Sequence, residues 1–120
     1  MAIGNLLVEK TKAFALKSIA AYERLKGRRE YVLSKQFLRS ATSIGANVAE
    51  GQYAQSRADF LAKYSIALKE ASETKYWIEL MIEAGYLHDS ESTTMLVADC
   101  EEVICLLAAA VKKLKGDQKK

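Results

Sequence analysis

The sequence predicts an all-α fold, an antiparallel up-and-down four-helix bundle that spans residues 1–120 as a single domain. Proline is absent and glycine occurs only six times in 120 residues, which leaves few of the turn residues that a β-sandwich or a loop-built enzyme site needs. Half of the residues are hydrophobic and 28% are charged, a balance typical of soluble globular domains. Four segments repeat apolar residues at helical spacing, and their short connections favour antiparallel neighbours.

The first helix is expected over residues 5–26, with Asn5 as its N-cap. The second is expected over residues 31–50, where Glu30 opens the helix after a basic turn formed by residues 26–29. The apolar positions on the core side of these two helices are Leu7, Phe14, Ala21 and Leu25, flanked by Val8, Ile19 and Tyr22, and then Leu33, Phe37, Ala41, Ile44 and Val48.

The third helix is expected over residues 57–84, where residues 56–59 resemble a capping box with Asp in place of the usual Glu. The fourth is expected over residues 90–115, capped by Asp89 or Ser90. The core positions of these helices are Phe60, Tyr64, Ala67, Leu68, Ala71, Ile78 and Ile82, and then Leu96, Cys100, Val103, Leu107, Val111 and Leu114.

Each expected helix ends at or close to a glycine. Glycine adopts a positive φ at little cost, and the residue just past the last helical turn often needs that conformation. We therefore expect four glycines at these C′ positions: Gly27, Gly51, Gly85 and Gly116.

The second helix contains three residues with two interpretations each. Gly45 lies in its interior, where glycine costs about 1 kcal/mol relative to alanine. It indicates either the close approach of a neighbouring backbone or a ligand site. Asn47 and Glu50 are candidates for catalysis, whereas the structural interpretation gives Glu50 a salt bridge or a hydrogen bond from a loop N–H group.

The third helix has a second apolar side. Ile66, Trp77 and Leu80 lie roughly 160–220° around the helix from Tyr64. A helix that is apolar on two sides is covered on its back by another subunit, unless these are scattered surface residues. We predict an oligomer interface at Ile66, Trp77 and Leu80, and we expect the acidic residues 70 and 73 on the same side to pair with basic groups opposite.

Residues 36–51 read Gln-Phe-Leu-Arg-Ser-Ala-Thr-Ser-Ile-Gly-Ala-Asn-Val-Ala-Glu-Gly. This run resembles the signature of the 23S rRNA intervening-sequence proteins, a family of four-helix bundles. Residues 69–77 and 83–87 match the family as well, so the resemblance covers nearly the whole chain. The family often has a proline before the second helix, where this chain has Gly27-Arg28-Arg29.

The resemblance implies an antiparallel four-helix bundle that assembles into a homo-oligomer, typically a pentameric ring. Members of the family are bacterial, and some are encoded within intervening sequences of large-subunit ribosomal RNA genes. The chain is also distantly similar to the accessory variability determinant of diversity-generating retroelements, which binds nucleic acid and a reverse transcriptase. No catalytic residues are established for the family, so the resemblance supplies none.

The groups that would make the chain an enzyme or a metalloprotein are missing from the sequence. His88 is the only histidine and is expected as a solvated residue in the turn before the fourth helix. A di-iron bundle needs two Glu-x-x-His motifs, and a zinc site from Cys100, Cys105 and His88 has poor spacing. Cys100 lies on the core side, where it serves as a small apolar residue. We predict no catalytic residue, no metal and no cofactor.

The sequence favours a cytoplasmic protein without a membrane anchor. The longest apolar run, residues 103–111, is far shorter than the roughly 18 residues of a membrane span. No secretory signal is visible at the start, and two cysteines are too few for a disulfide framework, so we expect a reducing compartment.

The positive charges are concentrated in the first half of the chain. Residues 1–60 carry a net charge of +5, residues 61–108 carry −6, and residues 109–120 carry +4. Steps of seven residues place three of the basic side chains along one face of the first helix, and two more extend this line into the turn: Lys10, Lys17, Arg24, Arg28 and Arg29.

Two functions follow from this charge pattern. The first is an oligomeric accessory protein that binds RNA or DNA through the five basic residues, mainly at phosphates, because the aromatic residues form no evident stacking platform. The second is an oligomeric scaffold or adaptor that binds a protein partner, with the basic face solvated or in contact with acidic groups of that partner.

Overall fold

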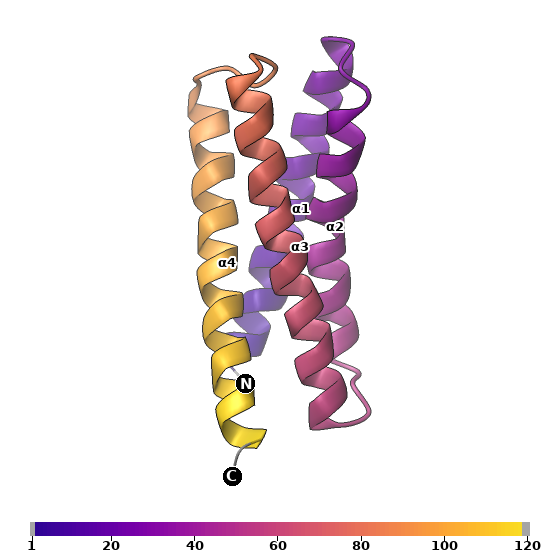
Figure 1. Ribbon diagram of the computed structural model, residues 1–120, viewed down its shortest axis with the longest axis vertical. Coiled ribbons are helices and arrows are strands. Elements are labelled where there is room, and N and C mark those ends of the chain that lie inside the picture. The colour runs from indigo at the N-terminus through magenta and orange to yellow at the C-terminus, as the bar shows by residue number, and fades with distance from the viewer. Residues whose placement is uncertain (1, 119–120) are drawn as a thin grey trace.

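Four long α-helices joined by short turns make up the computed structural model, which describes residues 2–118 (Figure 1). The helices are α1 (Ala2–Gly27), α2 (Leu33–Gly51), α3 (Arg57–Glu83) and α4 (Glu91–Gln118). Each helix packs against the next along the chain, and α4 returns to α1, so α2 lies diagonally across the bundle from α4. The predicted antiparallel up-and-down four-helix bundle is confirmed.

The core follows the predicted apolar positions closely. Its large, fully buried side chains come from all four helices: Leu7, Phe14, Leu25, Phe37, Ile44, Val48, Tyr64, Ile78, Val103 and Leu107. Several predicted core residues lie at its edge and are half-buried, namely Leu33, Phe60, Leu68 and Ile82. The prediction was wrong for Ile19, which is 42% exposed because it lies on the outer side of α1.

The predicted glycine cap is confirmed at the end of α3. Gly85 has a φ of 84° and donates its N–H to Ile82 O over 3.1 Å, while Tyr86 donates to Met81 O over 2.9 Å. This pair of bonds is the Schellman motif. The same motif ends α1, but there the left-handed residue is Arg29, with a φ of 63°.

At the end of α1, Glu30 donates its N–H to Leu25 O over 3.0 Å, and Arg29 donates to Lys26 O over 2.9 Å. Gly27 is the last residue of the helix and not its C′ residue, so the prediction for this glycine was wrong. The helix continues to Gly27 because contacts of the residues that follow this glycine fix the turn. Arg28 reaches the α3–α4 turn, and Glu30 caps α2.

Gly51 is the last residue of α2 and Gly116 lies within α4, so their predicted C′ role was wrong as well. At Gly51 the reason is space, because an added Cβ would lie 2.9 Å from Tyr64 Cε1 in the buried ring. At Gly45 an added Cβ would lie 3.4 Å from the backbone oxygen of Thr11 in α1. Gly45 therefore marks the close approach of a neighbouring backbone, the first of its two interpretations.

The two glycines of α2 are expected to respond to alanine in opposite directions. Gly45→Ala places its methyl group at ordinary contact distance from Thr11 and should raise the free energy of unfolding by about 0.5–1 kcal/mol through helix propensity. Gly51→Ala must displace the buried Tyr64 ring and should lower the free energy of unfolding by about 1–3 kcal/mol. Urea denaturation followed by circular dichroism measures both, and changes of the same sign would contradict this account.

The N-terminus of α2 is capped by a buried carboxylate. Glu30 accepts the backbone N–H groups of Val32, Leu33 and Ser34 at 3.2, 2.9 and 2.7 Å. Burial tends to raise the pKa of Glu30, but these hydrogen bonds outweigh it and hold the pKa below its ordinary value. The helix starts at Leu33, two residues after the expected start, because Glu30 must fold back over the first turn.

Candidate nucleic-acid interface

The five basic residues predicted for nucleic-acid binding follow α1 and the turn after it. Lys10 and Lys17 face α4, where Lys10 Nζ lies 3.2 Å from Glu102 Oε1 and Lys17 forms an ion pair with Asp99. Arg24 lies further along the same side of α1, beside Met95 of α4. The steps of seven residues therefore do place these three side chains on one side of the helix.

The two lysines form ion pairs with carboxylates of α4. Their side chains and those of Asp99 and Glu102 remain between 30% and 46% exposed, so the pairs lie at the surface. An exposed pair contributes only about 0–1 kcal/mol to stability, but it places a carboxylate next to each ammonium group. A phosphate that approaches this half of the line meets both charges.

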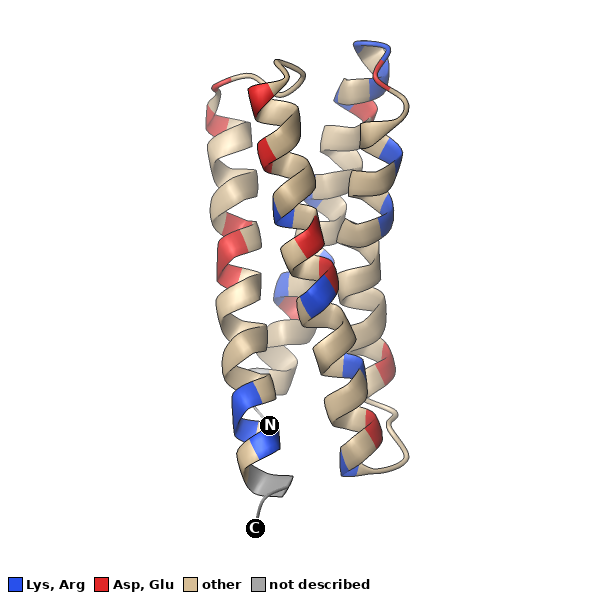
Figure 2. Ribbon diagram, in the orientation of Figure 1, with Lys and Arg blue, Asp and Glu red and all other residues tan. Residues whose placement is uncertain are grey.

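The arginines in the other half of the line form no ion pair with a carboxylate in the described part of the chain. Within residues 2–118, Arg24 and Arg29 have neither an ion pair nor a side-chain hydrogen bond. Arg28 donates from Nη1 to the backbone oxygens of Gly85 and Tyr86 at 3.0 and 2.6 Å, and these neutral acceptors leave its charge in place. Figure 2 shows this concentration of blue at the turn that joins α1 and α2. Glu30 in that turn keeps its negative charge, because its partners are neutral backbone N–H groups, but its carboxylate is buried and forms no ion pair with the three arginines among the described residues.

The predicted oligomer interface lies on the outer side of α3. Ile66 is 44% exposed, whereas Trp77 and Leu80 are half-buried. Trp77 packs edge-on against Tyr76, with ring centroids 5.2 Å apart, and Tyr76 is itself 56% exposed. We call these four residues, Ile66, Tyr76, Trp77 and Leu80, the α3 patch. Sequence reasoning missed Tyr76, although an aromatic residue next to a predicted anchor tryptophan was a usable signal.

Acidic residues beside the α3 patch pair within the same chain. Arg39 of α2 lies 3.1 Å from Glu70 Oε2 and also binds Glu73, so the expected basic partner comes from the neighbouring helix. Trp77 donates its indole N–H to Glu73 over 2.9 Å. This hydrogen bond, together with Arg39, lowers the pKa of Glu73 and keeps it ionised. The polar groups around the α3 patch are thus already fixed in the protomer.

Residues considered for catalysis or metal binding are dispersed. His88 is exposed in the α3–α4 turn, Cys105 is exposed, and Cys100 is fully buried, where burial raises the pKa of its thiol to about 12. Across residues 2–118, no group of His, Cys, Asp and Glu side chains is arranged to hold a metal ion. In the same part of the chain, no helix combines the length and apolarity that a membrane crossing needs.

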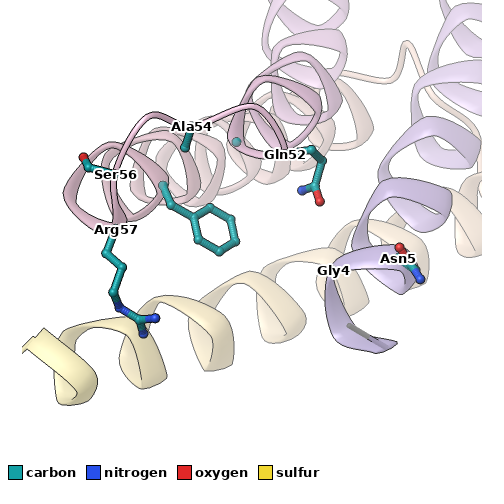
Figure 3. Close-up of a pocket in the computed structure, with 8 residues that line it drawn as sticks. Gly4, Asn5, Gln52, Ala54, Ser56 and Arg57 are labelled. Carbon is teal, nitrogen blue, oxygen red and sulfur yellow. The ribbon is translucent and has the colours of Figure 1, made fainter.

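A cleft of about 290 Å³ lies where the start of α1 meets the α2–α3 turn (Figure 3). Its polar side chains have structural roles. Gln52 donates to Tyr64 Oη over 3.0 Å, and Ser56 accepts the N–H of Asp59 over 3.0 Å, which confirms the predicted cap of α3. Arg57 reaches from the start of α3 toward the last turns of α4. The cleft presents no buried polar group to a ligand.

The family signature at residues 36–51 forms most of α2. Its residues pack the bundle: Ile44 and Val48 are fully buried, and Gly45 lies against α1. Asn47 donates to the Ser43 backbone oxygen over 2.9 Å, and Glu50 lies 3.7 Å from Lys63 Nζ, which confirms the structural interpretation of Glu50 as a salt-bridge partner.

The sequence profile of a family described as 23S rRNA-intervening sequence protein matches residues 5–109. The chain belongs to the 23S rRNA-intervening sequence protein family. A crystal structure of a protein with unknown function from the S23 ribosomal protein family, from Bacteroides thetaiotaomicron, is 44% identical and superimposes with a TM-score of 0.87. The match covers 92% of this chain and 98% of the Bacteroides protein. No curated protein sequence matches the chain.

Membership of the 23S rRNA-intervening sequence protein family confirms the predicted resemblance and the fold. The Bacteroides protein is described as having unknown function, so this similarity supplies an architecture and no activity. The features of this chain that bear on its function are therefore the positive charge of the basic turn and the exposed apolar side chains of the α3 patch.

Proposed function

We propose that this protein is a non-enzymatic, homo-oligomeric accessory factor that binds nucleic acid through the basic end of the bundle. The observation that carries the proposal is that Arg24, Arg28 and Arg29 form no ion pair among the described residues, whereas Lys10 and Lys17 do. Repeated in each subunit of an oligomer, the charge of these arginines produces a strong local field although one chain has a net charge of only +3.

The backbone of Arg29 supports a role for its side chain. A non-glycine residue in the left-handed region costs roughly 1–2 kcal/mol, and glycine would fill this C′ position without that cost. Backbone strain of this kind is found at functional sites. The turn therefore retains an arginine where the geometry favours glycine, and the exposed guanidinium is the group that an anionic ligand would contact.

Lys10 and Lys17 are expected to contribute less than the arginines. Each must bind a phosphate while a carboxylate of α4 lies beside it. The binding should be directed mainly at phosphates and should depend weakly on sequence, because the line consists of cationic side chains. Of the exposed aromatic residues, Tyr31 follows the basic turn and Tyr86 lies in the α3–α4 turn that Arg28 binds, whereas Tyr53 and Tyr76 lie elsewhere on the surface.

Fluorescence anisotropy with labelled RNA and DNA at several salt concentrations tests the proposal. The double variant Arg24→Ala/Arg29→Ala should weaken binding to all sequences alike and reduce the salt slope by about two. The matched control, Lys10→Ala/Lys17→Ala, removes the same charge but should have a smaller effect. Absence of binding by the wild-type protein at low salt would refute the proposal.

The α3 patch favours a second candidate, an oligomeric scaffold that binds a protein partner. Tyr76 is 56% exposed and was not assigned to the subunit contact, so a partner protein could cover it in the oligomer, and aromatic residues are frequent anchors in interfaces. This function becomes the leading one if the wild-type protein binds neither RNA nor DNA. A pull-down that succeeds with the wild-type chain and fails with Tyr76→Glu would support it.

A further inference from the structure

A short groove lies between α1 and α4 near the basic turn. Lys17, Ala20 and Arg24 line it from α1, and Ser92, Met95 and Leu96 line it from α4, around a volume of about 190 Å³. Its floor is apolar: Leu96 is 3% exposed and belongs to the core, while Met95 is 47% exposed. Cationic side chains separated by roughly 10 Å along the helix flank this apolar floor.

The groove ends where ion pairs close the space between the two helices. At the level of Lys10 and Lys17 the remaining cavity is only about 80 Å³, and the pairs with Glu102 and Asp99 bridge it. Carboxylates at this end disfavour a phosphate, whereas Arg24 and the basic turn favour one at the other end. A polyanion that enters the groove is therefore confined to its Arg24 end.

We infer that this groove receives an unstacked base of a single-stranded nucleic acid, whose phosphates contact Arg24 and the basic turn; the inference rests on the proposed function. A duplex keeps its bases stacked inside a convex surface of phosphates, so it reaches the cations and not the floor. The bases of a single strand are free to leave the stack and to contact side chains. The groove should therefore favour single-stranded nucleic acid over a duplex.

The lining residues suit the two parts of a nucleotide, its base and its phosphate. The thioether of Met95 is polarizable and makes favourable contacts with aromatic rings. The planar guanidinium of Arg24 pairs with phosphate and also stacks on ring systems. A second copy of this chain is the alternative occupant of an apolar groove, but the flanking arginine lacks a carboxylate partner in the described part of the chain and favours a polyanion.

The test compares three labelled probes on the full chain: a short oligothymidylate, a strand of the same length with abasic sites in place of the bases, and a duplex. The abasic strand carries the same phosphates, so it isolates the contribution of the bases. The oligothymidylate should bind about tenfold more tightly than the abasic strand. The variant Ala20→Phe fills the groove from an exposed position on α1 and should abolish this difference.

Two further variants complete the experiment. Ala109→Phe adds the same side chain at an exposed position of α4 outside the groove and should leave the difference intact. Met95→Ala, which removes the contacting side chain without adding volume, should reduce the difference even if Ala20→Phe does not fold.

The outcomes distinguish a failure of this inference from a failure of the proposed function on which it rests. Equal binding of the abasic strand and the oligothymidylate overturns the inference and leaves phosphate binding in place. Binding of none of the probes at low salt overturns the proposed function itself. A smaller oligomer mass for Ala20→Phe, measured by light scattering, would show that a second copy occupies the groove and would overturn the inference as well.

Discussion

Glu30→Ala is expected to lower the free energy of unfolding by about 2–3 kcal/mol, because it leaves the N–H groups of Leu33 and Ser34 without an acceptor. The loss is large for a single residue in a turn because the buried carboxylate is charged, and hydrogen bonds to a charged group contribute more than those between neutral groups. Urea denaturation measures the change. Glu9→Ala, an exposed acidic residue of α1, provides the control and should stay within about 0.5 kcal/mol of the wild type.

The same residue predicts a pH dependence. The pKa of Glu30 is lowered in the folded protein, so its contribution to stability is fully present above the pKa of the unfolded chain, about 4.3. This contribution is lost as the pH falls through the folded pKa. The stability difference between the wild type and Glu30→Gln should therefore shrink below about pH 4. A difference that stays constant down to low pH would contradict the capping role.

The double variant Trp77→Glu/Leu80→Glu is expected to convert the proposed oligomer into monomers. Each new carboxylate would be buried without a partner in the subunit contact, which costs several kcal/mol. Light scattering on the purified protein gives the mass, and circular dichroism should show that the helices persist. Ile66→Glu provides the same test at a position that is 44% exposed and therefore disturbs the protomer less.

Tyr53→Glu is the matched control for this experiment. Tyr53 is 87% exposed and lies in the α2–α3 turn, outside the α3 patch, so its replacement should leave the mass unchanged. A monomer mass for the wild-type protein at micromolar concentration would refute the oligomer. A mass that stays oligomeric in Trp77→Glu/Leu80→Glu would place the subunit contact elsewhere.

The fold could be predicted because local rules and packing agree along most of the chain. Phe37, Ile44 and Val48 repeat at helical spacing, and all three are fully buried. The end of α1 could not be predicted in the same way. Gly27 has the right residue type for a cap, but Arg28 binds the α3–α4 turn 57 positions away and Glu30 caps α2, so the left-handed residue is Arg29.

The positions of the basic side chains of the candidate site could be predicted from their spacing, but their ion-pair partners could not. Spacing alone placed Lys10, Lys17 and Arg24 on one side of α1. Asp99, which pairs with Lys17, is 82 residues away, and only the packing of α4 on α1 brings the two together. The sequence therefore showed where the positive charges lie but not which of them are compensated, and that difference moves the proposed contact toward the basic turn.

With four antiparallel helices, the first turn of α1 and the last turns of α4 lie at the same end of the molecule, as Figure 1 shows. The basic turn lies at the opposite end, about 39 Å away along the 26 residues of α1. A peptide tag or fluorescent fusion at either terminus therefore stands clear of Arg28 and Arg29. Protein tethered to a sensor surface through such a tag would present its basic end outward to the solution.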